Sequence, residues 1–309
     1  MIRFDKKIET KYIKENEVLF DIETTGINWY RDSVFLIGYI NGKTKTFTQL
    51  FSEDGNDREV LETFKKETEG FNYITYNGRS FDFPFINTRL LKYKLEPLKI
   101  LEEYDLYYQI RINKKILGIK QHKLTYIEKQ FGIERSEDIE SKNIPKKYMD
   151  FLKGVKDYKK LLIHNKEDVL NTEKLLFLRD KIINEKTFFI KDNIKAYIES
   201  IDIEKDFLKI KIKALSPYNM PINYYDNIHI IKWDKDQLDI VIRIIEGKDK
   251  EDDICLYLST IGNIKDKSSL NLDKNLLLIS RNTYYQMENI RNLINLVIDY
   301  FIVDKSEEI

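Results

Sequence analysis

Short apolar runs alternate with helical patterns over the first 183 positions of the chain. Four runs have the length and the content of β-strands: 18–24, 33–41, 43–51 and 71–77. Residues 57–68 carry apolar positions at the spacing of an amphipathic helix, and a longer helical pattern covers 158–183. Asn41-Gly42 favours a tight hairpin turn. Because a strand reached through a helix usually runs parallel to an earlier strand, this half predicts a mixed α/β sheet flanked by helices.

After residue 186 the pattern changes to alternation with a period of two. The predicted strands are 196–203, 207–215, 228–233, 238–245, 254–259 and 275–279, and the predicted closing helix is 284–301. This order predicts a smaller α+β domain with an antiparallel sheet backed by a helix. We therefore predict two domains, 1–185 and 186–309, and assign no function to the second.

Composition adds three constraints. The 52 lysines and arginines balance the 52 aspartates and glutamates, so a nucleic-acid site would have to be a local basic patch. Cys255 is the only cysteine, which excludes an internal disulfide and a cysteine-rich zinc site and is typical of a reducing compartment. The first 17 residues lack the apolar core of a signal peptide, and no apolar run approaches membrane-spanning length. We expect a cytoplasmic protein without a membrane segment.

The first predicted strand, which reads Val-Leu-Phe-Asp-Ile-Glu-Thr from residue 18, carries two acidic residues. Alternation along a strand places Asp21 and Glu23 on one face. Apolar neighbours on both faces indicate a central strand, where an ionised carboxylate is costly unless it is paired or bound to a metal ion. A bound divalent cation accounts for the pair. The alternative is an exposed strand end, where acidic residues are ordinary.

Two further aspartates stand where helices are predicted to begin. Asp82 follows the fourth strand and precedes Pro84, a residue suited to a first helical turn. It would lie beside the open end of the sheet, although a helix N-cap is its ordinary structural role. Asp105, just before a helix predicted at Leu106, is interpreted as such a cap rather than as a further acidic ligand.

His164 and Asp168 are four residues apart in the last helical pattern of the first half. They share a helix face with Leu161, Thr172 and Leu175, which is the apolar face. An aspartate on a buried face needs a partner. Either His164 supplies it in a purely structural pair, or both residues belong to the same site as the strand carboxylates.

These groups resemble motifs of known nucleases. The run Phe20-Asp21-Ile22-Glu23-Thr24 and the run from Tyr76-Asn77 to Phe81-Asp82 are similar to the first two motifs of family-B polymerase proofreading domains. A longer set resembles the YprB-type ribonuclease-H-like proteins: Lys123-Leu124, Ile127-Glu128, Phe131-Gly132-Ile133, Arg135, Ile144-Pro145, Tyr148, His164-Asn165 and Asp168-Val169. Residues 1–183 thus resemble the DEDD family of ribonuclease-H-like 3′–5′ exonucleases.

The resemblance implies a ribonuclease-H-like fold with a five-stranded mixed sheet and a site for two divalent ions, Mg²⁺ or Mn²⁺. Two such ions activate the attacking water and stabilise the leaving oxygen of an in-line displacement, and hard oxygen ligands suit both metals. Asp21 would bridge the ions. Glu23 and Asp168 would complete the nucleophile side, and Asp82 would hold the leaving-group side. His164 would orient or deprotonate the water.

The position of His164 departs from the familiar subclasses of this family. Proofreading domains have a tyrosine at this position, and the histidine-bearing DEDD subclass usually spaces its histidine one residue further from the aspartate. The YprB-type proteins share the spacing found here. The resemblance therefore implies a catalytic role for His164. It leaves open whether His164 acts as a general base or orients the water molecule.

A basic stretch between the second and third motifs is a candidate for contact with nucleic acid. It has no acidic residue, is flanked by tyrosines, and contains Arg111, Lys114, Lys115, Lys120 and Lys123. Cations that meet phosphates and rings that stack on bases suit a single strand, while a solvated loop and helix face is the alternative. The other candidates for nucleic-acid contact flank the acidic motifs: Thr24, Asn77, Arg79 and Phe81.

The leading hypothesis is a metal-dependent 3′–5′ exonuclease acting on DNA or RNA that is single-stranded or has a 3′ end. An endonuclease on the same site and a nucleic-acid-binding module without turnover are the alternatives. The presence of all four acids and His164 argues against the binding module. The choice between DNA and RNA depends on 2′-hydroxyl contacts that the sequence does not locate, and no pattern indicates the oligomeric state.

Overall fold

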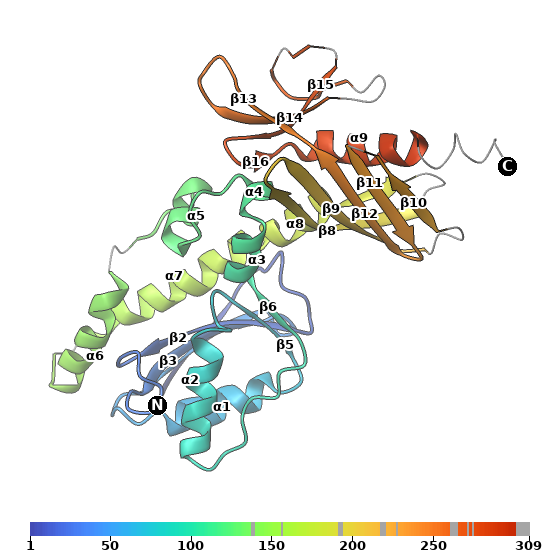
Figure 1. Cartoon of the computed structure of the whole chain (residues 1–309). Coiled ribbons are helices and arrows are strands. Elements are labelled where there is room, and N and C mark those ends of the chain that lie inside the picture. Colours follow the sequence, from blue (N-terminus) through green and yellow to red (C-terminus); the bar gives the residue numbers. More distant parts are fainter. Residues whose placement is uncertain are drawn as a thin grey trace. The chain divides into compact units, whose positions relative to one another are not determined.

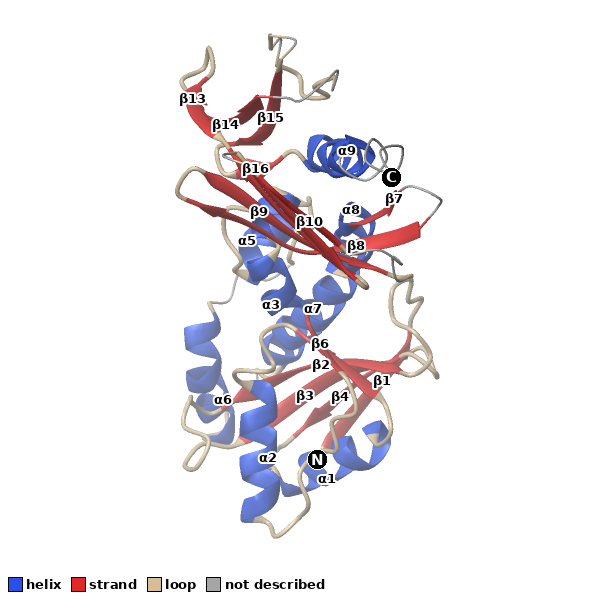
Figure 2. Ribbon diagram, turned by 45° about the vertical axis from the view of Figure 1, so that its right-hand side comes forward, coloured by secondary structure: helices blue, strands red, loops and turns tan. Residues whose placement is uncertain are grey.

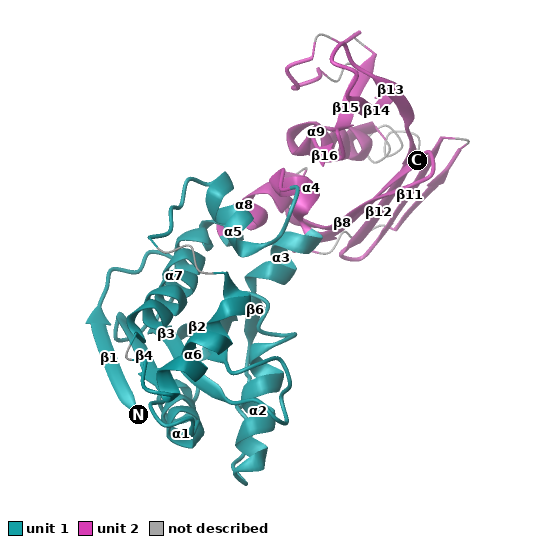
Figure 3. Cartoon of the chain, turned by 90° about the vertical axis from the view of Figure 1, so that its left-hand side faces the viewer, with its two compact units in different colours: residues 1–112, 120–179 teal, residues 113–119, 180–309 magenta. Residues whose placement is uncertain are grey.

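The computed structural model describes residues 1–300 except 137–139, 156, 191–193, 217–220, 227, 260–264, 271 and 274. The chain divides into two compact units (Figure 3), the first comprising residues 1–112 and 120–179 and the second 113–119 and 180–309. The predicted boundary was at residue 185. In the structure the chain enters the second unit at residue 180, and the short segment 113–119 also belongs to that unit. None of the described helices is long and apolar enough to span a membrane.

The first unit contains a six-stranded mixed sheet with the strand order β1-β4-β3-β2-β5-β6 (Figure 1). The strands are β1 Ile2–Lys7, β2 Glu17–Thr24, β3 Val34–Asn41, β4 Thr46–Phe51, β5 Asn72–Thr75 and β6 Glu103–Asp105. β5 pairs parallel with β2, as predicted for a strand reached through a helix, whereas β3 pairs antiparallel with β2. β2 is therefore a central strand with both edges paired.

Helices cover both faces of this sheet (Figure 1). α1 (Arg58–Thr68) and α2 (Asp82–Lys92) pack on one face (Figure 2). There the ring of Phe20 contacts the rings of Phe64 and Phe83. α7 (Lys159–Leu175) packs against β2 and β3 on the other face. The remaining helices of this unit are α3 Leu106–Ile112, α5 Leu124–Gln130, the 3₁₀ turn η1 Ser141–Asn143 and α6 Ile144–Leu152.

The predicted α/β class is confirmed, and the predicted number of five strands is wrong because the sheet has six. β1 is an edge strand that exposes most of its side chains, so its sequence IRFDKK offers little apolar alternation to recognise. The hairpin after Asn41 is also longer than the tight turn predicted there. Residues 42–45 form the turn, and it closes with Lys45 at a positive φ of 51°.

The helical pattern 158–183 corresponds to two helices rather than one. α7 ends at Leu175, and α8 spans Phe177–Lys186. At the junction the Leu176 N–H donates to the Glu173 carbonyl and the Arg179 N–H to the Leu176 carbonyl, so the ladder tightens to a spacing of three. The apolar spacing runs on across this junction, which is why the sequence does not reveal the break.

The second unit contains two antiparallel sheets in place of the single predicted one, with orders β10-β11-β12-β9-β8-β7 and β13-β14-β15-β16. The strands are β7 Thr187–Ile190, β8 Ile194–Glu204, β9 Phe207–Ala214, β10 Ile222–Tyr225, β11 His229–Asp234, β12 Gln237–Arg243, β13 Ile245–Lys248, β14 Ile254–Ser259, β15 Leu276–Arg281 and β16 Tyr284–Tyr285. All six predicted strands are present. The four that were missed, β7, β10, β13 and β16, have at most four residues each.

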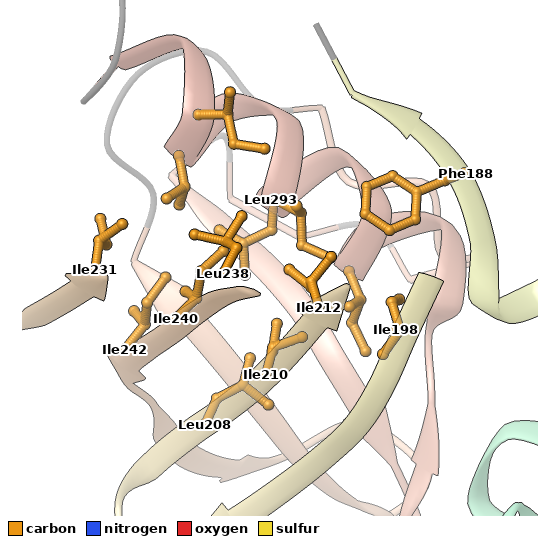
Figure 4. Packing of buried hydrophobic residues seen from close by; sticks show 14 of the residues in the cluster. Phe188, Ile198, Leu208, Ile210, Ile212, Ile231, Leu238, Ile240, Ile242 and Leu293 are labelled. Carbon is orange, nitrogen blue, oxygen red and sulfur yellow. The ribbon is translucent and has the colours of Figure 1, made fainter. Parts of the chain in front are cut away.

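An apolar core joins the larger of these sheets to the closing helix. Leu293 of α9 (Met287–Ile298) lies in one apolar cluster with Ile210 and Ile240 of the sheet (Figure 4). The inserted helix α4 (Lys114–Leu117) packs Ile116 against the same core. The predicted end of the closing helix, Phe301, lies outside the described residues.

Candidate functional site

A cleft of about 630 Å³ opens in the first unit at the C-terminal end of β2. Its walls come from β2 and the loop after it, from the segment between β5 and α2, from η1 and the start of α6, and from α7. It brings together all five predicted catalytic residues: Asp21, Glu23, Asp82, His164 and Asp168. Residues more than 140 positions apart in the sequence thus share one concave surface.

Asp21 and Glu23 lie on the face of β2 that α7 covers, as strand alternation predicts. They stand opposite Gly38 and Leu36 of β3 in the sheet. The Glu23 side chain is only 11% exposed, so the alternative of a solvated strand end is wrong. Its Oε1 atom is buried and has no hydrogen-bond partner among the described residues. A buried acidic oxygen without a donor is a position where a cation fits.

Asp82 is the first residue of α2, and its carboxylate reaches β2. Oδ1 accepts a hydrogen bond of 3.2 Å from the Ile22 N–H. The N-cap position belongs to Phe81, so the capping alternative for Asp82 is wrong. Capping is confirmed instead for Asp105, whose Oδ1 accepts a 3.1 Å hydrogen bond from the Tyr108 N–H in the first turn of α3.

One turn of α7 supplies His164 and Asp168. The Nε2 atom of His164 lies 3.3 Å from Asp168 Oδ2 and 3.9 Å from Glu23 Oε1. One ligand atom from each of these three residues lies within 4.8 Å of the others, a spacing that lets them share a metal ion. His164 and Asp168 therefore belong to the carboxylate cluster and are not an isolated structural pair.

Burial raises the pKa values of all four carboxyl groups, and repulsion by neighbouring acids adds to it. Burial is the largest cause for Asp21 and Glu23, and repulsion by Asp168 and Asp82 adds to it, so the pKa values of both lie well above their usual range. Burial likewise raises the pKa of Asp82 to about 7. Positive charge from a divalent cation would relieve this repulsion and restore the ionised forms. The donor set fits such an ion.

Arg135 belongs to the site and was absent from the predicted catalytic set. Its guanidinium lies 2.6 Å from Asp168 Oδ1 and donates to both oxygens of the buried Glu128 at 2.6 and 2.7 Å. This positive charge lowers the pKa values of Asp168 and Glu23, against the effect of burial. The signal available in the sequence was the YprB-type motif, which contains both Glu128 and Arg135.

The predicted nucleic-acid contacts next to the acidic motifs divide into two groups. Thr24, Asn77 and Phe81 line the cleft. Arg79 does not line it, because its guanidinium pairs with Glu103 at 3.4 Å and lies over the Tyr108 ring. Only the first group is placed to touch a substrate in the cleft.

The basic stretch 111–123 does not form part of the cleft. Arg111 lies over the ring of Tyr108 in the first unit. Lys114 and Lys115 are on α4, which belongs to the second unit, and Lys115 lies over the Tyr285 ring there. Lys120 and Lys123 precede α5. None of the five predicted basic residues, all of which the structure describes, is among the cleft-lining side chains: Arg111, Lys114, Lys115, Lys120 and Lys123.

Comparison with curated proteins shows two kinds of relative. The uncharacterised protein YprB of Bacillus subtilis (strain 168) is 29% identical over 200 residues, which cover 60% of this chain and 47% of YprB. The PolC-type DNA polymerase III of Mycoplasma pneumoniae is 32% identical over 116 residues, covering 29% of this chain and 8% of the polymerase. The chain thus spans about half of YprB and a small part of the polymerase.

Comparison with solved structures shows distant likenesses. The family B DNA polymerase of Pyrobaculum calidifontis has a TM-score of 0.43 and 20% identity, covering 55% of this chain and 25% of the polymerase. A zinc-bound complex of E. coli ExoI with ssDNA has a TM-score of 0.33 and 14% identity, covering 66% of this chain and 55% of the other.

A protein-family model also matches this chain. The model of the RNase_H superfamily (RNase_H_2) matches residues 18–178, from the start of the acidic strand to the helix that follows Asp168. That range is more than half of the 309 residues and contains every acidic residue of the cleft cluster. The chain belongs to the RNase H superfamily.

Proposed function

We propose that this chain is a metal-dependent 3′–5′ exonuclease of the DEDD type. The observation that carries the proposal is the convergence of four carboxylates and a histidine in one cleft of an RNase H superfamily fold. A structural role does not explain acidic groups whose pKa values burial and repulsion raise, since such groups cost stability. Similarity to PolC-type DNA polymerases supports a nucleic-acid substrate.

The four acids would hold two ions, Mg²⁺ or Mn²⁺, because carboxylate oxygens are the hard donors that these metals prefer. Bound there, the ions would activate a water molecule and stabilise the leaving oxygen during phosphodiester hydrolysis. Asp21 would bridge them, which is consistent with the repulsion that it experiences from all three other acids. Glu23 and Asp168, the acids that face His164, would form the nucleophile side, and Asp82 the leaving-group side.

His164 is the residue that would act on the attacking water molecule. Its Nε2 atom faces both Glu23 and Asp168, so a water molecule held by those acids would lie within its reach. His164 would either accept a proton from that water or hold it in line with the phosphate, and general-base help is worth about 10²–10⁴ in rate. Arg135 binds Oδ1 of Asp168 and leaves Oδ2 turned toward His164.

The rim of the cleft suits an unpaired base, which favours single-stranded DNA or RNA and single-stranded 3′ ends. Ile27 lines the cleft and is 85% exposed, and Tyr30 on the same loop is 75% exposed. Internal hydrogen bonds fix this loop: Asp32 Oδ2 accepts from the Asn28 N–H at 2.7 Å, and Asn28 Oδ1 accepts from the Tyr30 N–H at 3.1 Å. Apolar side chains that are fixed in an exposed position can stack on the unpaired bases of a single strand. In a duplex the same bases are paired.

The test uses strands of one sequence, as DNA and as RNA, labelled either at the 5′ end or internally. In Mg²⁺ or Mn²⁺, an exonuclease should shorten the 5′-labelled strand stepwise, and a phosphorothioate linkage at the 3′ end should block it. Persistent internal cuts despite that block would identify an endonuclease. Metal-dependent binding without any cleavage would identify a binding module. The matching duplex tests strand preference, and excess EDTA tests the need for metal.

A further inference from the structure

Three residues lie side by side in one row of the first unit's sheet. Asp21 of β2 pairs with Gly38 of β3, and Gly38 pairs in turn with Gln49 of β4. Since glycine has no side chain, the row contains a gap between the carboxylate of Asp21 and the amide of Gln49. The gap opens on the face that α7 covers.

Asn165 of α7 fills this gap and is fully buried. Its Nδ2 atom donates to Asp21 Oδ2 at 3.0 Å and to the Asp21 backbone oxygen at 3.2 Å. A Cβ atom on residue 38 would lie 2.0 Å from Asn165 Oδ1, so only glycine leaves room for the amide. Asn165 thus ties the helix that carries His164 and Asp168 to the strand that carries Asp21.

Gln49 fixes which end of the Asn165 amide faces the carboxylate. Gln49 Nε2 donates to Asn165 Oδ1 at 2.9 Å and to the Leu162 carbonyl of the same helix at 2.9 Å. If the Asn165 amide turned over, its oxygen would face the Asp21 carboxylate and its NH₂ would face the NH₂ of Gln49. Both contacts would then be repulsive, so Gln49 keeps the donor directed at Asp21.

We infer that Asn165 is a positioning residue for Asp21. Gln49 orients the Asn165 amide, and Gly38 leaves room for it. The inference rests on the proposed function, because Asp21 binds metal only if that proposal holds. The hydrogen bond to Oδ2 stops the carboxylate from rotating and presents Oδ1 to a cation. Groups that orient a metal ligand in this way commonly account for about 10–100-fold in metal affinity.

The test compares substitutions that remove the donor or only its orientation. Asn165→Leu keeps a side chain of similar size without a donor. Gln49→Leu leaves Asn165 in place but removes the hydrogen bond that keeps its amide from turning over. Asn171→Leu is the matched control: it makes the same change at a buried position of the same helix, where the side chain accepts a hydrogen bond from Lys174. Mn²⁺ binding is measured by calorimetry on the full chain without nucleic acid, alongside the metal-free melting temperature.

We expect Asn165→Leu to weaken Mn²⁺ binding by about 10–100-fold, Gln49→Leu to weaken it less, and Asn171→Leu to leave it unchanged. If Asn165→Leu fails to fold, Gln49→Leu carries the test, since a purely structural amide would change the melting temperature without changing Mn²⁺ affinity. Wild-type Mn²⁺ affinity in the folded variants at 165 and 49 would overturn the inference. Absence of Mn²⁺ binding by the wild-type protein would overturn the proposed function itself, which is a separate result.

Discussion

Two buried polar clusters, one in each unit of the chain, differ in whether their groups have hydrogen-bond partners. The first unit gathers four carboxyl groups whose charges repel one another, and it leaves Glu23 Oε1 without a hydrogen-bond donor among the described residues. In the second unit, the buried Asn289 donates to Asp266 at 2.7 Å and to the Leu278 carbonyl at 2.8 Å, beside an apolar core. A satisfied buried amide supports a fold, whereas unsatisfied like charges indicate a site that a ligand completes.

Removing one acid should give the largest effect and should act on the first unit alone. Asp82→Asn deletes a proposed metal ligand, so we expect Mg²⁺-dependent cleavage to fall by about 10³-fold or more. The same change removes one repelling charge, so the metal-free protein should be as stable as the wild type or more stable. Single-turnover cleavage and thermal unfolding in EDTA measure the two effects.

Asp5→Asn is the matched control for that substitution. Asp5 lies on the edge strand β1, 44% exposed and paired with Arg3, and it should change neither cleavage nor the response to metal. Wild-type turnover by Asp82→Asn would remove Asp82 from the proposed ligand set.

His164 separates two chemical roles within the same cluster. We expect His164→Ala to lose about 10²–10⁴ in cleavage rate if the imidazole is the general base, together with the rise of rate with pH that such a base produces. His164→Tyr supplies a hydroxyl that can orient water but is a poor base near neutral pH. Partial activity of the tyrosine variant is expected if orientation is the main role.

Cleavage rates across pH for the three proteins decide between these roles. Equal rates for the wild type, His164→Ala and His164→Tyr would show that His164 is only a structural partner of Asp168.

A core substitution in the second unit should lower stability without changing metal binding, which is the reverse of the effect expected for Asp82→Asn. Leu208 is fully buried in the apolar core on β9, and Leu208→Ala should cost about 2–5 kcal/mol through lost burial and the cavity left behind. Denaturant unfolding followed by tryptophan fluorescence reports on this unit through Trp233, which is 2% exposed in the same core, once Trp29 of the first unit is replaced by Phe in all the proteins compared. Mn²⁺ affinity should stay at the wild-type value. A loss of metal binding in the folded variant would show that the second core supports the metal site.

The last prediction concerns the pH dependence of the stability of the metal-free protein. The pKa of Asp82 is about 7 in the folded chain, whereas an unfolded aspartate titrates near 3.9. The folded state therefore binds the extra proton between these values, so the contribution of Asp82 to stability is greatest below about pH 4 and is lost as pH rises toward 7. We expect the melting temperature of the first unit in EDTA to fall by about 2–4 °C for each kcal/mol lost.

Two comparisons sharpen this prediction. Asp82→Asn should show a weaker fall across the same window, because its amide does not titrate. Added Mg²⁺ should restore the melting temperature at pH 7–8, and a flat pH profile in EDTA would contradict the raised pKa of Asp82.

The sequence by itself determined the features that depend on local periodicity. Alternation along 18–24 placed Asp21 and Glu23 on one face, and the spacing of four placed His164 beside Asp168. The order of strands and helices predicted that β5 runs parallel to an earlier strand, and in the structure that strand is β2. These features follow from backbone geometry, which repeats every two residues in a strand and every 3.6 in a helix. The acidic motifs themselves were recognised by resemblance to a known family.

Only the tertiary structure decided which long-range contacts complete the site. The gap at Gly38 is filled by Asn165 because three strands and a helix meet there, and no local pattern encodes that contact. Arg135 reaches Asp168 across 33 positions of the sequence, and the basic stretch 111–123 is divided between the two units. Such contacts depend on the packing of elements against one another, and that packing is set by burial over the whole unit rather than by neighbouring residues.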